Sequence, residues 1–178
     1  MKKNIIFLIF ILFSFNKFTY AESQYSFSVP SLDVSSYALM DVRTGSIIAG
    51  KNLDKKVEPA SLTKIATLYL VFKSLKSKYI SEDDYTTVSK KAWKMVGSRM
   101  FIEVGKKVQI KDLIQGVIVQ SGNDASIAIA EHVAGGEEFF VTMLNKLAKD
   151  MGLSNTNFTN VTGMPNKDHY TTARDLAI

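Results

Sequence analysis

The stretch Glu58-Pro59-Ala60-Ser61-Leu62-Thr63-Lys64-Ile65-Ala66-Thr67 decides how this chain folds around its polar residues. Proline is tolerated just outside the start of a helix. From Ile65 the chain continues Ile-Ala-Thr-Leu-Tyr-Leu-Val-Phe, and a helix that is apolar on nearly every side is usually buried. We therefore predict a buried helix over residues 61–78, although its first turn carries Ser61 and Lys64.

A serine and a lysine at this position suggest a nucleophile and its base. Their spacing of three places Ser61 and Lys64 on one face of a helix. The positive end of the helix dipole favours an oxyanion and disfavours an ammonium group, so Lys64 can accept the proton of Ser61 as a neutral amine. The S-x-x-K pattern alone is not specific, because Ser14-Phe15-Asn16-Lys17 also fits it.

Residues 1–21 have the pattern of a secretory signal peptide. Met1-Lys2-Lys3 is followed by nine apolar residues, 5–13, and Thr19-Tyr20-Ala21 places small residues before a cleavage point. The apolar run is too short for an ordinary transmembrane helix; an uncleaved N-terminal anchor is the alternative. We predict that the protein is exported and that residues 22–36 form a flexible mature N-terminus.

Charge and composition exclude several classes of function. The net charge of +5 falls to +2 without residues 1–21, which argues against a nucleic-acid partner. The chain has no cysteine, so an exported domain must be held by its apolar core. His132 and His169 are far apart in sequence and outside any H-E-x-x-H pattern, which argues against a zinc site.

The rest of the chain alternates turns and helical patterns. Two apolar runs within residues 37–50 predict a hairpin with Gly45 in the left-handed turn position. Residues 101–110 predict a second small hairpin around Gly105. Apolar residues at helical spacing predict helices over residues 111–119, 125–134 and 137–151.

A second polar group, Gln120-Ser121-Gly122-Asn123-Asp124-Ala125, separates two of these apolar helices. The Ser121 hydroxyl can relay a proton between Lys64 and a leaving amine, and the Asn123 amide can hold both Lys64 and a substrate amide. Ser and Asn are also common helix caps, so a purely structural role is an equal alternative at this point.

These motifs together resemble the serine D-alanyl-D-alanine carboxypeptidases, which are low-molecular-mass penicillin-binding proteins. The resemblance covers about residues 37–178 in the order of the family. It is carried by residues 37–45, Pro59-Ala-Ser-Leu-Thr-Lys64, Val88-Ser-Lys-Lys-Ala-Trp93, Gly97-Ser-Arg-Met100, Gln120-Ser-Gly-Asn-Asp-Ala125, Gly163-Met-Pro-Asn166 and His169-Tyr-Thr-Thr-Ala-Arg-Asp-Leu-Ala177.

The resemblance implies an α+β fold of the β-lactamase/DD-peptidase (penicillin-recognising) type. It implies that Ser61 is the acyl-enzyme nucleophile, Lys64 its base, Ser121 the proton relay and Asn123 the partner of the substrate amide. The backbone N–H of Ser61 would be one donor of the oxyanion hole. The implied substrate is a peptidoglycan stem pentapeptide ending in D-Ala-D-Ala, β-lactams would acylate Ser61, and no cofactor is implied. The implied location is the periplasm, at the outer face of the inner membrane.

One motif of the family is missing. The sequence contains no Lys-Thr-Gly or Lys-Ser-Gly, which in the family binds the terminal carboxylate of the substrate. Thr172-Ala-Arg-Asp175 predicts a helix start just before Ile178. We interpret residues 37–178 as a truncated catalytic domain: its mostly helical half plus one hairpin of the sheet, without the C-terminal strands, the β domain and the helix that would anchor it to the membrane surface. Such a piece is expected to be inactive by itself.

Two other functions stay open. A class A β-lactamase would have S-D-N in place of Ser121-Gly122-Asn123, and a glutamate at the position of Val141 before Leu144-Asn145. A non-catalytic, exported wall-binding domain would keep Ser61 and Lys64 only as a helix start. Labelling with a fluorescent penicillin separates these possibilities.

Overall fold

The computed structural model describes residue 29 and residues 31–178. The signal-peptide prediction and most of the predicted flexible N-terminus therefore lie outside the described residues. The chain divides into two units, residues 1–32 and 33–178, and all elements below belong to the second. They form a group of helices with two small antiparallel sheets.

The first sheet is the predicted hairpin. Strands β1 (Tyr37–Met40) and β2 (Ile47–Lys51) pair antiparallel, and Gly45 lies at the turn with a φ of +70°. The carboxylate of Asp41 accepts the N–H of Thr44 at 2.8 Å, which holds the turn closed. The prediction of a hairpin with a left-handed glycine is confirmed.

The helix that follows is not buried on every side, so that prediction is wrong. A 3₁₀ turn, η1 (Ala60–Leu62), leads into α2 (Thr63–Lys76), and Pro59 lies just outside the turn as predicted. The apolar side chains of Ile65 and Phe72 are 62% and 46% exposed. The buried face consists of Thr63, Lys64, Thr67, Leu70, Val71 and Ser74. The polar residues of this face form hydrogen bonds inside the protein, which makes their burial tolerable. The sequence could not specify the buried side, because a run that is apolar at nearly every position shows no helical period.

The second sheet has a different partner from the predicted one. Strand β4 (Lys107–Gln109) pairs with β3 (Tyr85–Thr87), not with residues 101–104. Gly105 does form the turn, with a φ of +77°. The N–H groups of residues 100–102 donate instead to the buried carboxylate of Asp124, which removes them from any strand pairing.

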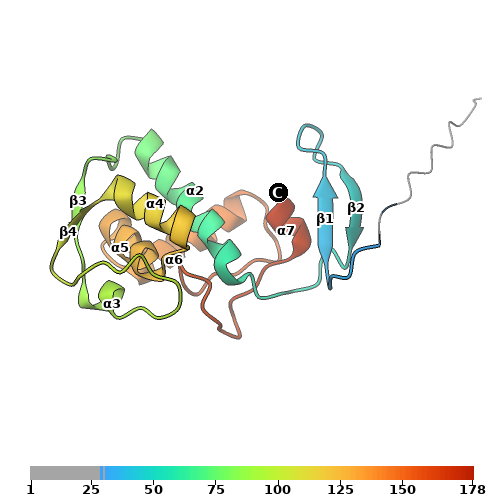
Figure 1. Ribbon diagram of the computed structural model, residues 1–178. Helices are drawn as coiled ribbons and strands as arrows, with labels where there is room; N and C mark the ends of the chain where they lie inside the picture. Colours follow the sequence, from blue (N-terminus) through green and yellow to red (C-terminus); the bar gives the residue numbers. More distant parts are fainter. Residues whose placement is uncertain (1–28, 30) are drawn as a thin grey trace, which may run out of the picture. The chain divides into compact units, whose positions relative to one another are not determined.

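The core is built around one central helix. Helix α5 (Asn123–Ala134) packs against α2, the short α3 (Lys90–Trp93), α4 (Ile110–Gln120) and α6 (Glu137–Asp150) (Figure 1). The predicted helices 111–119, 125–134 and 137–151 are confirmed, with ends that agree within two residues. Nine residues of α5 are buried, and its alanines permit the close packing of the helices around it.

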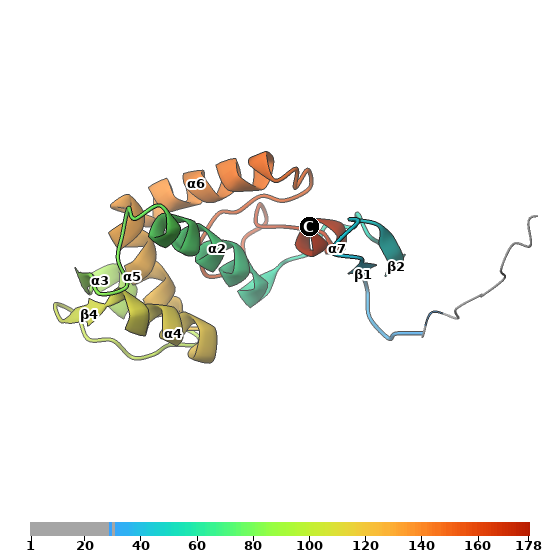
Figure 2. The same cartoon turned by 90° about the horizontal axis from the view of Figure 1, so that it is seen from above.

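The last element returns to the first sheet. Helix α7 (Ala173–Ala177) is capped by Thr172, whose hydroxyl accepts the N–H of Asp175 at 3.1 Å as predicted. It lies beside β1 in both views (Figures 1 and 2). Within residues 31–178 no helix combines the length and the hydrophobicity needed to span a bilayer.

Candidate active site

Ser61 lies in the 3₁₀ turn before α2, with its side chain exposed. Ala60 holds a left-handed φ of +47°, which is unusual for a residue other than glycine, and such residues are enriched at functional sites. Gly163 packs directly on this turn: a Cβ there would collide with the carbonyl of Ala60 and lie 3.0 Å from the nitrogen of Ser61. The backbone of the candidate nucleophile is therefore fixed by a close approach that only glycine permits.

Lys64 is buried beside this serine, with 4% of its surface exposed. Its Nζ lies 3.3 Å from Ser61 Oγ, 2.8 Å from Asn123 Oδ1 and 2.8 Å from the carbonyl oxygen of Thr162. Burial lowers the pKa of Lys64 to about 8, because the charged form loses solvation. Lys64 is thus available as a neutral amine near neutral pH.

The neighbours of Lys64 also orient it. A neutral amine has two N–H donors and one lone pair. Asn123 Oδ1 and the carbonyl of Thr162 are acceptors only, so they take both N–H groups. The lone pair then faces the third neighbour, Ser61 Oγ. This geometry suits the transfer of a proton from Ser61 to Lys64.

Asn123 connects this pair to the segment before α4. Its side chain is 5% exposed, and its Nδ2 donates to the carbonyl of Val96 at 2.7 Å. Its backbone N–H donates to the carbonyl of Ser98, also at 2.7 Å. The structure therefore brings Asn123 to Lys64. It does not cap α5, which begins after Gly122 without a side-chain cap, so the capping interpretation of Asn123 is wrong.

Ser121 ends α4 in a left-handed conformation, with a φ of +52°. Within the described residues its hydroxyl forms no hydrogen bond with Lys64 or Asn123. The backbone of Ser121 is thus strained and close in sequence to the site, whereas its side chain is not engaged in it here.

The loop of residues 159–164 completes the surroundings of Lys64, and the sequence motifs assign no site residue to it. Thr67 Oγ1 donates to the carbonyl of Val161 at 2.9 Å, and Thr159 N–H donates to Nδ1 of the buried His169 at 3.0 Å. His169 Nε2, which must then carry the hydrogen, lies 2.7 Å from Thr63 Oγ1. The loop is thereby fastened to the polar face of α2. Gly163, within the Gly163-Met-Pro-Asn166 stretch, is the sequence signal that could have indicated it.

The part of the chain that the structure describes contains no group of three His, Asp or Glu side chains that could hold a metal ion.

Comparison with known proteins places this geometry in a family. The family model described as D-alanyl-D-alanine carboxypeptidase matches residues 23–178. The D-alanyl-D-alanine carboxypeptidase DacC of Escherichia coli is 43% identical over 173 residues, which are 94% of this chain and 43% of that protein. DacF of Bacillus subtilis, another D-alanyl-D-alanine carboxypeptidase, is 40% identical over 82% of this chain and 38% of its own length.

A solved structure supports the same family assignment through its fold. Penicillin-binding protein 5 from Haemophilus influenzae superimposes with a TM-score of 0.83 at 40% identity, over 85% of this chain and 45% of that one. This confirms the predicted α+β, penicillin-recognising fold. The chain spans about two fifths of the length of the curated relatives it matches. On the strength of the family match, the sequence identities and the shared fold, the chain belongs to the D-alanyl-D-alanine carboxypeptidase family.

Proposed function

We propose that the protein containing this chain is a serine-type carboxypeptidase that removes the terminal D-alanine from peptidoglycan stem peptides ending in D-Ala-D-Ala. The observation that carries the proposal is the placement of Lys64 Nζ, 3.3 Å from Ser61 Oγ and held by two further acceptors. The family membership supplies the substrate class.

The reaction begins at Ser61. The neutral amine of Lys64 takes the hydroxyl proton while Ser61 Oγ attacks the carbonyl of the penultimate D-alanine. The N–H of Ser61, which finds no acceptor among the described residues, is one donor for the resulting oxyanion. Collapse breaks the peptide bond, the proton passes to the leaving amine of D-alanine, and an acyl-enzyme ester remains. Water then hydrolyses that ester and restores Ser61.

Ser121 and Asn123 have supporting roles in this proposal. Ser121 relays the proton from Lys64 to the leaving amine, which requires its hydroxyl to turn toward Lys64 when substrate is bound. Asn123 keeps Lys64 in place and offers its amide to the substrate backbone. The left-handed backbone of Ser121 and the hydrogen bond between Lys64 and Asn123 support these assignments.

Covalent labelling with a fluorescent penicillin tests the proposal, because β-lactams acylate the same serine. The protein expressed from its complete reading frame is expected to take the label, and Ser61→Ala is expected to lose it. Equal labelling of the Ser61→Ala variant, or an unlabelled parent, overturns the enzyme proposal and favours a non-catalytic wall-binding domain. Slow release of the label is expected; rapid turnover would instead indicate a β-lactamase.

We also propose that residues 1–21 are a signal peptide and that the mature protein acts in the periplasm, at the outer face of the inner membrane. The support is the basic start, the short apolar run and the small residues up to Ala21. N-terminal sequencing of the exported protein tests this, with Glu22 as the expected first residue. Retention of Met1 in the exported form contradicts it.

A further inference from the structure

We propose that Asn160 is a positioning residue that holds the peptide unit between Thr162 and Gly163 in the orientation that presents the Thr162 carbonyl to Lys64. This inference rests on the proposed function, since Lys64 is the base in that reaction. It adds a residue that, within the described part of the chain, forms no hydrogen bond with Ser61 or Lys64 and acts through a backbone group.

The two ends of one peptide unit carry the inference. The carbonyl oxygen of Thr162 accepts from Lys64 Nζ at 2.8 Å. The N–H of Gly163, at the other end of the same planar unit, donates to Asn160 Oδ1 at 2.7 Å. Because C=O and N–H point in opposite directions across a trans peptide, fixing the N–H fixes the direction of the carbonyl. Asn160 and Lys64 therefore hold the same peptide from its two sides.

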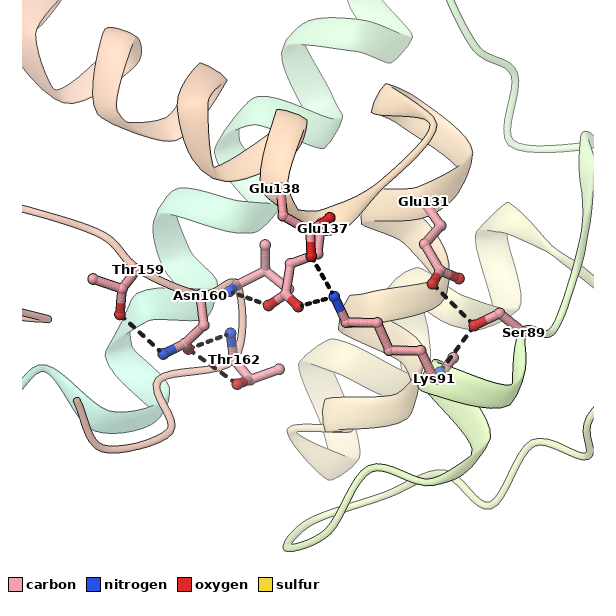
Figure 3. A network of polar contacts seen from close by, with 10 residues as sticks. Ser89, Lys91, Glu131, Glu137, Glu138, Thr159, Asn160 and Thr162 are labelled. Carbon is pink, nitrogen blue, oxygen red and sulfur yellow. Dashed lines mark hydrogen bonds and ion pairs between the residues drawn. The ribbon is translucent and has the colours of Figure 1, made fainter.

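Asn160 is the centre of its turn. Its Oδ1 also lies 3.1 Å from both the nitrogen and the Oγ1 of Thr162 and 3.2 Å from the nitrogen of Met164. Its Nδ2 donates to the carbonyl of Met164 at 2.9 Å. Figure 3 shows Asn160 between Thr159 and Thr162, with its amide directed at the turn. One side chain thus supplies hydrogen-bond partners to the backbone of a loop that is not paired in either of the two described sheets.

The neighbouring residue is fastened separately. Glu137 Oε1 accepts the N–H of Val161 at 3.2 Å, while its Oε2 pairs with Lys91 at 2.8 Å (Figure 3). Thr67 holds the carbonyl of Val161 from α2. These contacts keep the loop docked without Asn160, but none of them reaches the peptide between Thr162 and Gly163.

Loss of Asn160 is therefore expected to release one peptide unit rather than the whole loop. Gly163 has a φ of +86°, and glycine gives this peptide freedom to rotate when its N–H is not held. Lys64 then loses one of the two acceptors that direct its lone pair at Ser61. The chemical step should slow, while non-covalent binding of a β-lactam should change little.

The test compares Asn160→Ala with Asn145→Ala in the protein expressed from its complete reading frame. Asn145 is the matched control because its side chain holds the residue just before this loop, bonding the N–H and the carbonyl of Phe158 at 2.8 Å each. Stopped-flow acylation by a fluorescent penicillin separates the dissociation constant from the first-order rate. We expect Asn160→Ala to lower the first-order rate by about 10- to 100-fold with the dissociation constant within about twofold of the parent. Asn145→Ala should lose thermal stability but keep the first-order rate.

Asn160→Asp provides a second variant, which keeps an acceptor oxygen for the N–H of Gly163. It also places a negative carboxylate beside the peptide that contacts Lys64, which favours the ammonium form of Lys64. Acylation is expected to be about three- to tenfold slower at pH 7 and to recover toward the parental rate at higher pH. This readout remains decisive if Asn160→Ala does not fold.

The outcomes separate this inference from the proposed function. A parent that takes no label at Ser61 overturns both. A labelled parent whose Asn160→Ala variant acylates like Asn145→Ala overturns the positioning role alone. An Asn160→Asp variant that acylates with the parental pH profile, or that stays slow at high pH, also contradicts it.

Discussion

The buried face of α2 carries four polar side chains beside Leu70 and Val71, while three large apolar side chains on its other side are exposed. Thr63, Lys64, Thr67 and Ser74 are buried, whereas Ile65, Tyr69 and Phe72 are 46% to 62% exposed. An ordinary amphipathic helix has the reverse arrangement. The inward face is tolerated because every buried side-chain nitrogen and oxygen within the described residues has a hydrogen-bond partner.

The difference shows where this helix gains its chemistry. Thr67 bonds the carbonyl of Val161, Thr63 bonds His169, and Lys64 bonds Thr162 and Asn123. A buried amine is more easily deprotonated than an exposed one because its charged form loses solvation, so burial itself prepares Lys64 as a base. The inward face of α2 therefore holds the lysine of the candidate site and also fastens the loop of residues 159–164.

The largest expected effect is at the centre of the inward face. Lys64→Met keeps the length of the side chain but removes the amine, and we expect acylation of Ser61 by a penicillin to fall by about 1,000-fold. Lys73→Met on the exposed side of α2 is the matched control and should acylate like the parent. If both variants acylate at the parental rate, Lys64 is not the base.

The pH dependence of the parent follows from the same residue. Because the neutral amine is the reactive form and burial lowers the pKa of Lys64 to about 8, the acylation rate should rise with pH up to about 8 and then level off. A rate that is constant between about pH 6 and 9 would show that Lys64 does not titrate in the reaction.

The next largest effect tests the contact between the loop and the nucleophile. A methyl group at Gly163 would collide with the carbonyl of Ala60, so Gly163→Ala should displace the turn that carries Ser61. We expect acylation to fall by about 100-fold, since small misplacements of reacting groups cost this much. Gly152→Ala has the same left-handed cost at a φ of +78° but no atom within 4 Å of the added carbon. It should lose only about 1 kcal/mol of stability and no acylation rate.

Much of the fold could be predicted because its signals are local. Gly45 and Thr172 mark a turn and a helix start by chemistry that acts within four residues, and the helices 111–119, 125–134 and 137–151 have clear periods. The partner of β4 could not be predicted, because the competing segment is removed from pairing by Asp124, which lies 22 residues beyond Ile102. The inward face of α2 could not be predicted either, since its partners lie near residues 123 and 160.

The residues of the site likewise fall into those that the sequence indicated and those that it did not. A spacing of three places Ser61 and Lys64 together, and the polar break at Ser121–Asn123 indicated a second group that reaches Lys64. The carbonyl of Thr162 has no sequence signature, because every residue carries one. Asn160-Val161-Thr162 fits a glycosylation pattern, which by sequence alone we attribute to chance. In the structure the same residues form the turn that holds this carbonyl, which is a physical reason for the Asn-x-Thr spacing.

A smaller effect is expected at Thr67, which is fully buried and bonds the carbonyl of Val161 at 2.9 Å. Thr67→Val keeps the shape but leaves that carbonyl without its side-chain donor, and should lower the free energy of unfolding by about 1–2 kcal/mol. Thr142→Val is the control, because the Thr142 hydroxyl also bonds a backbone carbonyl but is exposed. Denaturant unfolding measures both; equal losses would mean that the loop contact stabilises no more than a surface hydrogen bond.

The smallest effect is a pH dependence of stability at His169. Burial lowers the pKa of His169, opposed by the nearby carboxylate of Glu58. A proton on Nδ1 would also face the N–H of Thr159, which this nitrogen now accepts. Just below the ordinary histidine pKa of about 6.5, His169 is protonated in the unfolded chain but stays neutral in the folded protein. The contribution of His169 to the free energy of unfolding is therefore complete above about pH 6.5, shrinks as the pH falls toward the lowered pKa, and then stays constant.

Denaturant titrations from about pH 7 to 5 should show this slope in the parent and a flatter one in His169→Gln. Equal slopes would mean that the imidazole between α2 and the loop is as easily protonated as a free one.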